Sequence, residues 1–275
     1  MLKRLAIAAA AFVAIQAAIP MAWAGEILDR VTKRGEVKLV LLNDYPPFSF
    51  INDKNELVGF DIDVAKAFAE RLGVKLSIDT PAWEVIAAGN WRGRWDICIC
   101  SMTPTAERAE VLDFPVKYYE SPAVLVVHKD ETRIKGIGDI TGKTVAAQSG
   151  ASYEAYLQQT LKITAPDAQQ PSFPFGKVTV APYETETVAF QDLALGGGKR
   201  LDAVITNYIT AKERIDATGR FKIVSDKLYA EPNWVAVEKG DAAWSAKVKA
   251  TIEALKADGT LSAISKRWIG IDITG

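Results

Sequence analysis

The sequence contains few of the residues that bind metals well. Its 275 residues include two cysteines, Cys98 and Cys100, and a single histidine, His128. A Cys-x-Cys pair supplies only half of a tetrahedral zinc shell and His128 lies far along the chain, so we expect no metal site. Positions i and i+2 of one strand share a face at a spacing that strains a disulfide, which favours two free, buried thiols over a disulfide.

Basic residues are not in excess. The chain has 33 lysines and arginines against 34 aspartates and glutamates, a formal charge of −1 at pH 7. Nucleic-acid binding needs a basic patch, and this balance argues against it. The glycine run at 196–198 lacks the spacing and the following Lys-Ser/Thr of a phosphate-binding loop, so we expect no nucleotide and no other cofactor.

Only one apolar run is long, and it lies at the start of the chain. Lys3 and Arg4 precede the apolar residues 5–19, a break follows at Pro20, and a small-x-small site ends at Ala24. These features predict a secretory signal peptide over residues 1–24. The run falls short of the roughly 20 residues of a spanning helix, which disfavours a membrane anchor. We therefore expect a soluble protein, exported to the periplasm, whose length fits two lobes better than one core.

The segment from 95 to 119 holds the strongest site signal. A buried strand is predicted at 97–100, a polar loop with Ser101 and Thr103 follows, and a helical turn then carries Arg108. Open α/β sheets bind ligands where strands end and helices begin. The planar fork of Arg108 can hold a carboxylate in two parallel hydrogen bonds. The alternative is that Arg108 caps a helix or pairs with a neighbouring glutamate on the surface.

Two aromatic residues follow other predicted strands. Tyr45 comes after the strand at 37–42 and Trp83 after the strand at 75–78, in the order βαβαβ. Parallel strands place their carboxyl ends at one edge of a sheet, so both loops should meet the loop of Arg108. Each ring then forms a pocket wall, with ordinary surface packing as the alternative for Tyr45.

A second α/β unit begins near residue 123. A strand at 144–148 leads into a helix start with Ala151 and Ser152, where backbone N–H groups meet an anion or are simply capped. A further strand at 201–207 ends in Asn207. Two units with one connection out and one back suggest two lobes around a cleft.

These segments resemble the periplasmic solute-binding proteins for polar amino acids that serve ABC importers, known as solute-binding protein family 3. The similarity covers nearly all of residues 27–270. It rests on nine segments in order: LDRVTKRGEVKLVL at 28–41, PPFSF at 46–50, GFDIDVAKAFAERLG at 59–73, GRWD at 93–96, SMTPTAERAEVLDF at 101–114, GKTVAAQSGASYEAYL at 142–157, LDAVITN at 201–207, EKGD at 238–241 and ADGTLSAISKRWIG at 257–270.

The resemblance implies the α/β, type II periplasmic-binding-protein fold, in which two crossover strands join two lobes. Lobe 1 would comprise residues 25–121 and 234–275, and lobe 2 residues 122–233. The resemblance also implies a ligand site in the cleft: Arg108, Ala151 and Ser152 on the α-carboxylate, Ser101 and Thr103 on the α-ammonium, and Tyr45 and Trp83 around the side chain.

One position departs from the family. The strand that carries DAVITN ends in Asn207, where the family usually has an aspartate that neutralises the ligand ammonium. An amide cannot balance a buried charge, so either another carboxylate substitutes or the ligand amine is modified or absent. No replacement is evident in the sequence, which favours a modified amine. The position of Leu42 is often acidic in binders of basic amino acids, so lysine and arginine are not expected here.

The resemblance implies a monomeric receptor that binds a small amino acid or derivative and delivers it to a membrane permease. The alternative is an exported dehydratase-like enzyme that acts on a small carboxylic acid on the same fold. The predicted site loops contain no histidine and no paired carboxylates, so we expect no catalysis. A sensor domain is disfavoured because no signalling module follows.

Overall fold

The computed structural model describes residues 25–166 and 168–275. The predicted signal peptide, residues 1–24, lies outside the described residues. Among the helices that are described, none has both the length and the apolar character needed to span a membrane.

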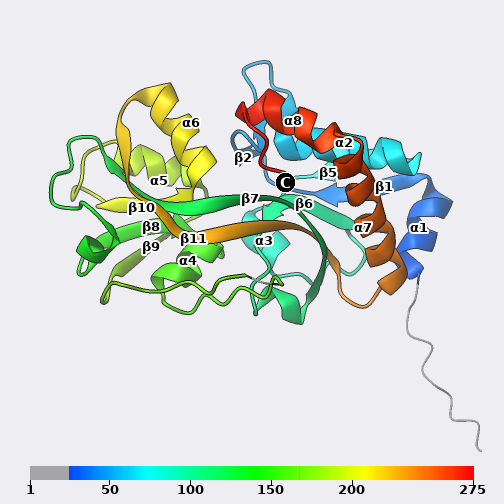
Figure 1. Cartoon of the computed structure of the whole chain (residues 1–275), viewed down its shortest axis with the longest axis horizontal. Helices are drawn as coiled ribbons and strands as arrows, with labels where there is room; N and C mark the ends of the chain where they lie inside the picture. Colours follow the sequence, from blue (N-terminus) through cyan, green and yellow to red (C-terminus); the bar gives the residue numbers. More distant parts are fainter. Residues whose placement is uncertain (1–24, 167) are drawn as a thin grey trace, which may run out of the picture.

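One mixed sheet of eight strands runs through the molecule (Figure 1). Its order is β5-β1-β6-β11-β7-β10-β8-β9. At one end β1 pairs in parallel with β5 and β6, and at the other β8 pairs in parallel with β9 and β10. The strands are β1 Glu36–Val40, β5 Lys75–Asp79, β6 Ile97–Met102, β7 Leu112–His128, β8 Thr144–Gln148, β9 Thr179–Tyr183, β10 Ala203–Asn207 and β11 Phe221–Glu238.

The two central strands are long and join the two ends of the sheet. β7 has 17 residues and β11 has 18, and they pair antiparallel along most of their length. Within β11, the mainly apolar segments 221–224 and 234–237 are separated by a more polar stretch. The polar residues between them stay extended because β7 pairs with them, with register shifts near Ser225 and Asn233.

The helices fall into two groups (Figure 1). The first half of the molecule combines β1, β5 and β6 with α1, α2, α3, α7 and α8, and the second half combines β8, β9 and β10 with α4, α5 and α6. The bounds are α1 Glu26–Arg34, α2 Phe60–Leu72, α3 Trp83–Ala87, α4 Ser152–Leu157, α5 Glu186–Leu193, α6 Tyr208–Thr218, α7 Ala242–Ala257 and α8 Thr260–Ile269, with 3-10 turns η1 Arg108–Glu110 and η2 Ile137–Ile140.

Helix α2 begins after a glycine. Its N-cap is Gly59, with φ 135°. A Cβ at Gly59 would lie 2.2 Å from the carbonyl oxygen of Phe48, so only glycine lets the chain pass there. Asp61 is therefore inside the first turn, where its side chain is buried.

A small antiparallel sheet lies beside α2 and carries Tyr45. It consists of β2 Asp44–Tyr45, β3 Ser49–Ile51 and β4 Leu57–Val58. The ring of Phe48 stacks on Tyr45 and on Tyr119, which anchors this sheet to strand β7. Packing from both sides thus fixes the aromatic residue after β1.

The prediction of two free thiols is wrong. Cys98 and Cys100 are both buried on β6 and are joined as a disulfide. Their Cα atoms are 5.4 Å apart, within the usual range for bridged cysteines. The spacing along this strand is therefore shorter than the sequence argument assumed.

Candidate ligand-binding site

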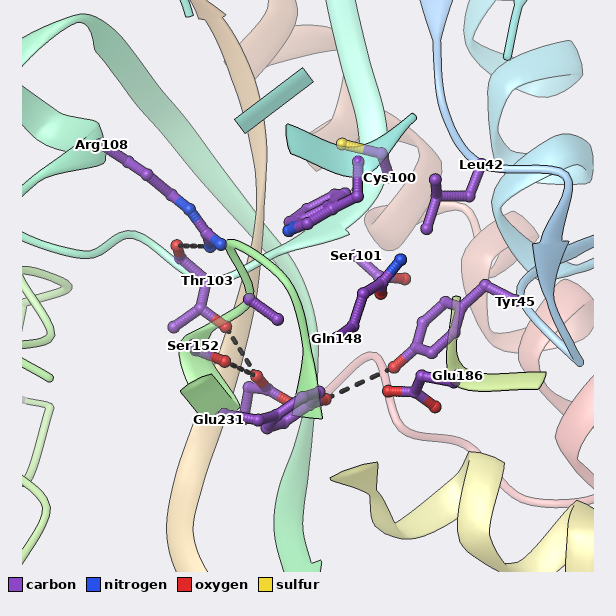
Figure 2. Close-up of a pocket in the computed structure, with 13 residues that line it drawn as sticks. Leu42, Tyr45, Cys100, Ser101, Thr103, Arg108, Gln148, Ser152, Glu186 and Glu231 are labelled. Atoms are coloured by element: carbon purple, nitrogen blue, oxygen red, sulfur yellow. Dashed lines mark hydrogen bonds between the residues drawn. The ribbon is translucent and has the colours of Figure 1, made fainter. Parts of the chain in front are cut away.

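A small cavity lined by both polar and apolar side chains lies between the two halves (Figure 2). Its volume is about 20 Å³, room for about one water molecule. Seven of the eight predicted site residues line it: Tyr45, Trp83, Ser101, Thr103, Arg108, Ala151 and Ser152. It is also lined by Leu42, Cys100, Gln148, Tyr153, Glu186 and Glu231.

Arg108 lies at one side of this cavity. It begins the turn η1 just after β6, and only 5% of the residue is exposed. Its guanidinium donates to the carbonyl of Thr103 at 2.9 Å and to that of Gly150 at 2.8 Å, and it lies over the ring of Trp83. Burial lowers the pKa of Arg108 to about 10, against the attraction of Glu231, so the guanidinium is charged at neutral pH.

The side chain of Arg108 is turned into the protein and away from its neighbouring glutamates. A surface ion pair with Glu107 or Glu110 needs an exposed side chain, and none forms among the described residues. Both hydrogen bonds of its guanidinium go to carbonyl groups, which do not neutralise a cation. The structure thus holds a buried, oriented positive charge.

Ser101 is held in an unusual backbone conformation. Its φ is 56°, in the left-handed region that few residues other than glycine adopt. Its hydroxyl donates to Asp61 at 2.8 Å, and its backbone N–H donates to the hydroxyl of Tyr118 at 2.7 Å. Tyr118 in turn donates to Asp61 at 2.8 Å. Burial raises the pKa of Asp61 to about 7, and this buried network fixes the turn that follows β6.

Glu231 is the main residue that the sequence argument missed. It lies on β11, is 3% exposed, and accepts from four side chains. These are the hydroxyls of Thr103 at 2.9 Å, Ser152 at 2.6 Å and Tyr153 at 2.7 Å, and the amide of Asn207 at 3.3 Å. No cation pairs with it among the described residues. The cavity therefore has a buried carboxylate close to the predicted ammonium position.

Asn207 is not at the cavity surface. Its Oδ1 accepts from the hydroxyl of Ser121 and from the backbone of Ile209, both at 2.9 Å, so the side chain caps α6. Its Nδ2 donates to Glu231. Asn207 therefore does not line this cavity, and a buried carboxylate, Glu231, lies next to it. The pairing of β10 and β11 with β7 brings Asn207 and Glu231 together.

The start of α4 forms part of the opposite wall. Ser152 is 4% exposed, and its hydroxyl bonds Glu231. The backbone N–H of Ala151 donates to Gln148, and that of Gly150 donates to Glu154. These two N–H groups, of Gly150 and Ala151, are therefore bonded within this half of the molecule.

Direct contacts connect the two halves around the cavity. Tyr45 and Trp83 are both buried and line the cavity wall. The indole of Trp83 donates to the carbonyl of Gly150 at 3.1 Å, and the hydroxyl of Tyr45 lies 3.4 Å from that of Tyr153. Thr187 donates to Asp44 at 2.6 Å, and Thr210 to the carbonyl of Pro46 at 3.3 Å.

A sheet of this order, crossed by two long strands with a charged cavity between its halves, defines the type II periplasmic-binding-protein class. The chain belongs to the bacterial extracellular solute-binding proteins, family 3, whose sequence pattern matches residues 37–271. This confirms the fold class and the family predicted from the sequence.

Curated relatives cover most of the chain. It is 30% identical over 250 residues to the L-cystine-binding protein TcyJ of Escherichia coli K12. The matched region covers 90% of this chain and 88% of that protein. It is 29% identical to ABC transporter arginine-binding protein 1 of the same organism, over 82% of this chain and 86% of that protein.

Solved structures show the same fold. A mutant of ArgBP from T. maritima superposes with a TM-score of 0.77 at 29% identity, covering 89% of this chain and 99% of that chain. The ancestral amino acid-binding protein AncCDT-1, described as a precursor of cyclohexadienyl dehydratase, superposes with a TM-score of 0.75 at 29% identity, covering 88% and 99%.

Proposed function

We propose that this protein is a periplasmic receptor that binds a polar amino acid or amino-acid derivative and delivers it to the permease of an ABC importer. It acts as a monomer, without a cofactor and without catalysis. Its lobes are residues 25–121 with 234–275, and residues 122–233, and the ligand binds between them.

The observation that carries this proposal is the charge pattern of the cavity. Arg108 and Glu231 are both buried, have opposite charges, and form no ion pair with each other or with any other described residue. A buried charge without a counter-ion costs several kcal/mol. A zwitterion satisfies both charges at once, its carboxylate on Arg108 and its ammonium on Glu231.

The neighbouring groups fit this orientation. The hydroxyl of Thr103 bonds Glu231 and the guanidinium of Arg108 bonds the carbonyl of Thr103, so one loop holds both ends of the site. Tyr45, Trp83 and Leu42 supply apolar surface for the rest of the ligand. The side chain of the amino acid would extend between them.

Binding requires the halves to separate. A cavity of about 20 Å³ does not admit an amino acid. The halves are joined through β7 and β11, whose register shifts near Ser225 and Asn233 are places where a two-stranded connection can bend. Hinge opening would break the contacts of Trp83 and Tyr45 with the second half, and closure on a ligand would restore them.

The relatives support this class of ligand. The curated names are those of cystine- and arginine-binding proteins, and the arginine-binding one is named as part of an ABC transporter. A similar role for this chain is consistent with its cavity, which contains a buried cation, Arg108, and a buried acid, Glu231.

Calorimetric titration of residues 25–275 with the twenty amino acids and cystine tests the proposal. We expect saturable binding of at least one α-amino acid and no binding of its decarboxylated amine. Absence of binding to every amino acid would overturn the proposal.

One observation favours a second candidate, a dehydratase. Glu186 lines the cavity, and burial raises its pKa to about 7, which suits a general acid at neutral pH. Incubation with prephenate and measurement of released product tests this. We expect no turnover, and multiple turnovers would establish the enzyme instead.

A further inference from the structure

Glu186 has an oxygen atom with no partner. The residue begins helix α5, is 2% exposed and lines the cavity. Its Oε2 accepts from the hydroxyl of Thr206 at 2.6 Å, while Oε1 has no hydrogen bond within the described part of the chain. A buried carboxylate oxygen without a donor is costly, and such atoms commonly mark a contact that a ligand completes.

No ion pair to Glu186 forms among residues 25–166 and 168–275. The charge of Arg214 acts to lower the pKa of Glu186, but its guanidinium donates to Thr187 and lies close to Glu213. Glu231 and Asp44 add negative charge around Glu186, and burial with these neighbours raises its pKa to about 7. The carboxylate thus has two acidic neighbours and a nearby base, Arg214, that does not bond to it.

The cavity as a whole carries two acids and one base. Glu186 and Glu231 face it from the second half and from β11, and Arg108 is the base that lines it. A ligand that balances these charges has one carboxylate and two cationic groups. A neutral amino acid would balance Arg108 and Glu231 and would leave Glu186 unpaired.

The three charged residues follow the length of the cavity. Figure 2 shows Arg108 and Glu186 on opposite sides, with Glu231 between them and Tyr45 next to Glu186. Hydrogen bonds trace the same order, because Tyr153 donates to Glu231 and its hydroxyl lies 3.4 Å from that of Tyr45. A ligand held by its α-carboxylate at Arg108 and its ammonium at Glu231 would extend its side chain toward Glu186.

We propose that Glu186 binds a cationic group at the end of the ligand side chain, so that the protein selects amino acids with a second amine or a guanidinium. This inference rests on the proposed function and narrows its ligand class. It also revises the expectation drawn from Leu42, because an acid from the second half would take the place of one at the first strand end.

Matched ligands and matched variants test this inference. Calorimetry on residues 25–275 compares L-lysine with L-norleucine, which has a similar chain without the terminal ammonium, and adds L-ornithine and L-arginine. In the native protein we expect at least one cationic amino acid to bind about tenfold or more tightly than L-norleucine. Glu186→Gln should lower that affinity about tenfold and change L-norleucine binding less than threefold.

Glu184→Gln is the matched control, because Glu184 is exposed, lies two residues earlier, and undergoes the same change of charge. It should leave both affinities within about twofold. Thermal unfolding of each variant separates loss of folding from loss of binding.

Two outcomes would overturn the inference. Equal affinity for lysine and norleucine in the native protein, with other neutral amino acids bound, would remove Glu186 from recognition and leave the proposed function standing. Binding of no amino acid at all would overturn both.

Discussion

The hydroxyl of Thr103, in the loop after β6, donates to Oε1 of Glu231 on strand β11 at 2.9 Å. The carbonyl of the same threonine accepts from Arg108. One residue thus fixes the positive and the negative group of the cavity at a set separation. Thr103 and Glu231 belong to different proposed lobes, so this contact sets the spacing of the charges in the closed arrangement.

Replacing Arg108 with alanine should abolish amino-acid binding. The α-carboxylate would lose its charged partner, and truncation of one member of a desolvated pair typically costs about 2–5 kcal/mol. Calorimetry measures the loss, with Arg92→Ala as a control because Arg92 is exposed. Affinity within threefold of the native protein would show that the carboxylate binds elsewhere.

Glu231→Gln should weaken binding of ligands that carry an ammonium. Glutamine keeps the shape and a hydrogen-bond acceptor but does not balance the charge, so we expect a loss of about 2–5 kcal/mol. The comparison is between an α-amino acid and the α-hydroxy acid of the same side chain. The hydroxy acid should be little affected, and an equal loss for both would indicate general damage to the site.

Asn207→Asp should weaken binding of every amino acid. Its Nδ2 donates to Glu231, and a carboxylate there would place two like charges together or force one to take a proton. We expect a loss of about 1–3 kcal/mol, the usual range for a hydrogen bond to a charged group. The ratio between a free amino acid and its N-alkyl derivative should stay constant, and a shift toward the free amino acid would show that position 207 meets the amine.

Stability should fall as the pH rises from about 4 to about 7. Burial raises the pKa of Asp61 to about 7, so the native state binds a proton in this range that the unfolded state has released. The loss of stability is complete above the pKa of Asp61 in the folded state and absent below its pKa in the unfolded state. It amounts to roughly 2–4 kcal/mol for this group.

Urea unfolding at pH 5 and pH 8 measures this effect. Asp61→Asn should flatten the difference in unfolding free energy between the two pH values. Asp53→Asn, at an exposed position, should not change it. If Asp61→Asn keeps the native difference in unfolding free energy between pH 5 and pH 8, the titrating group is another one. Glu186 is such a group, because burial also raises its pKa to about 7.

Local patterns were enough to place Arg108, because its loop directly follows a buried strand. The same rule could have found Glu186, which follows β9 at a helix start just as Trp83 follows β5. Glu231 offered no such signal. It lies in a polar stretch without apolar alternation, and only the pairing of β11 with β7 brings it to the cavity and to Asn207.

The exact ends of helices and the contacts of the side chains within them were harder to predict. The start of α2 depends on the close approach of Gly59 to Phe48, which are distant along the backbone path but adjacent in space. The side chain of Asp61 is buried because it accepts hydrogen bonds from Ser101 and Tyr118, which lie in two other segments. Such details arise from tertiary contacts, and one sequence does not contain them in a local pattern.

The chain passes from the first half to the second and back again, and this affects the order in which the halves can fold during synthesis. The first half is built from both ends of the sequence, since Asp241 before α7 accepts from the backbone N–H groups of Gly25 and Ile27. The second half is continuous, and the strands that enter and leave it are neighbours, with Ala123 opposite Tyr229. During synthesis the second half can therefore complete its core first, while the first half must wait for α7 and α8.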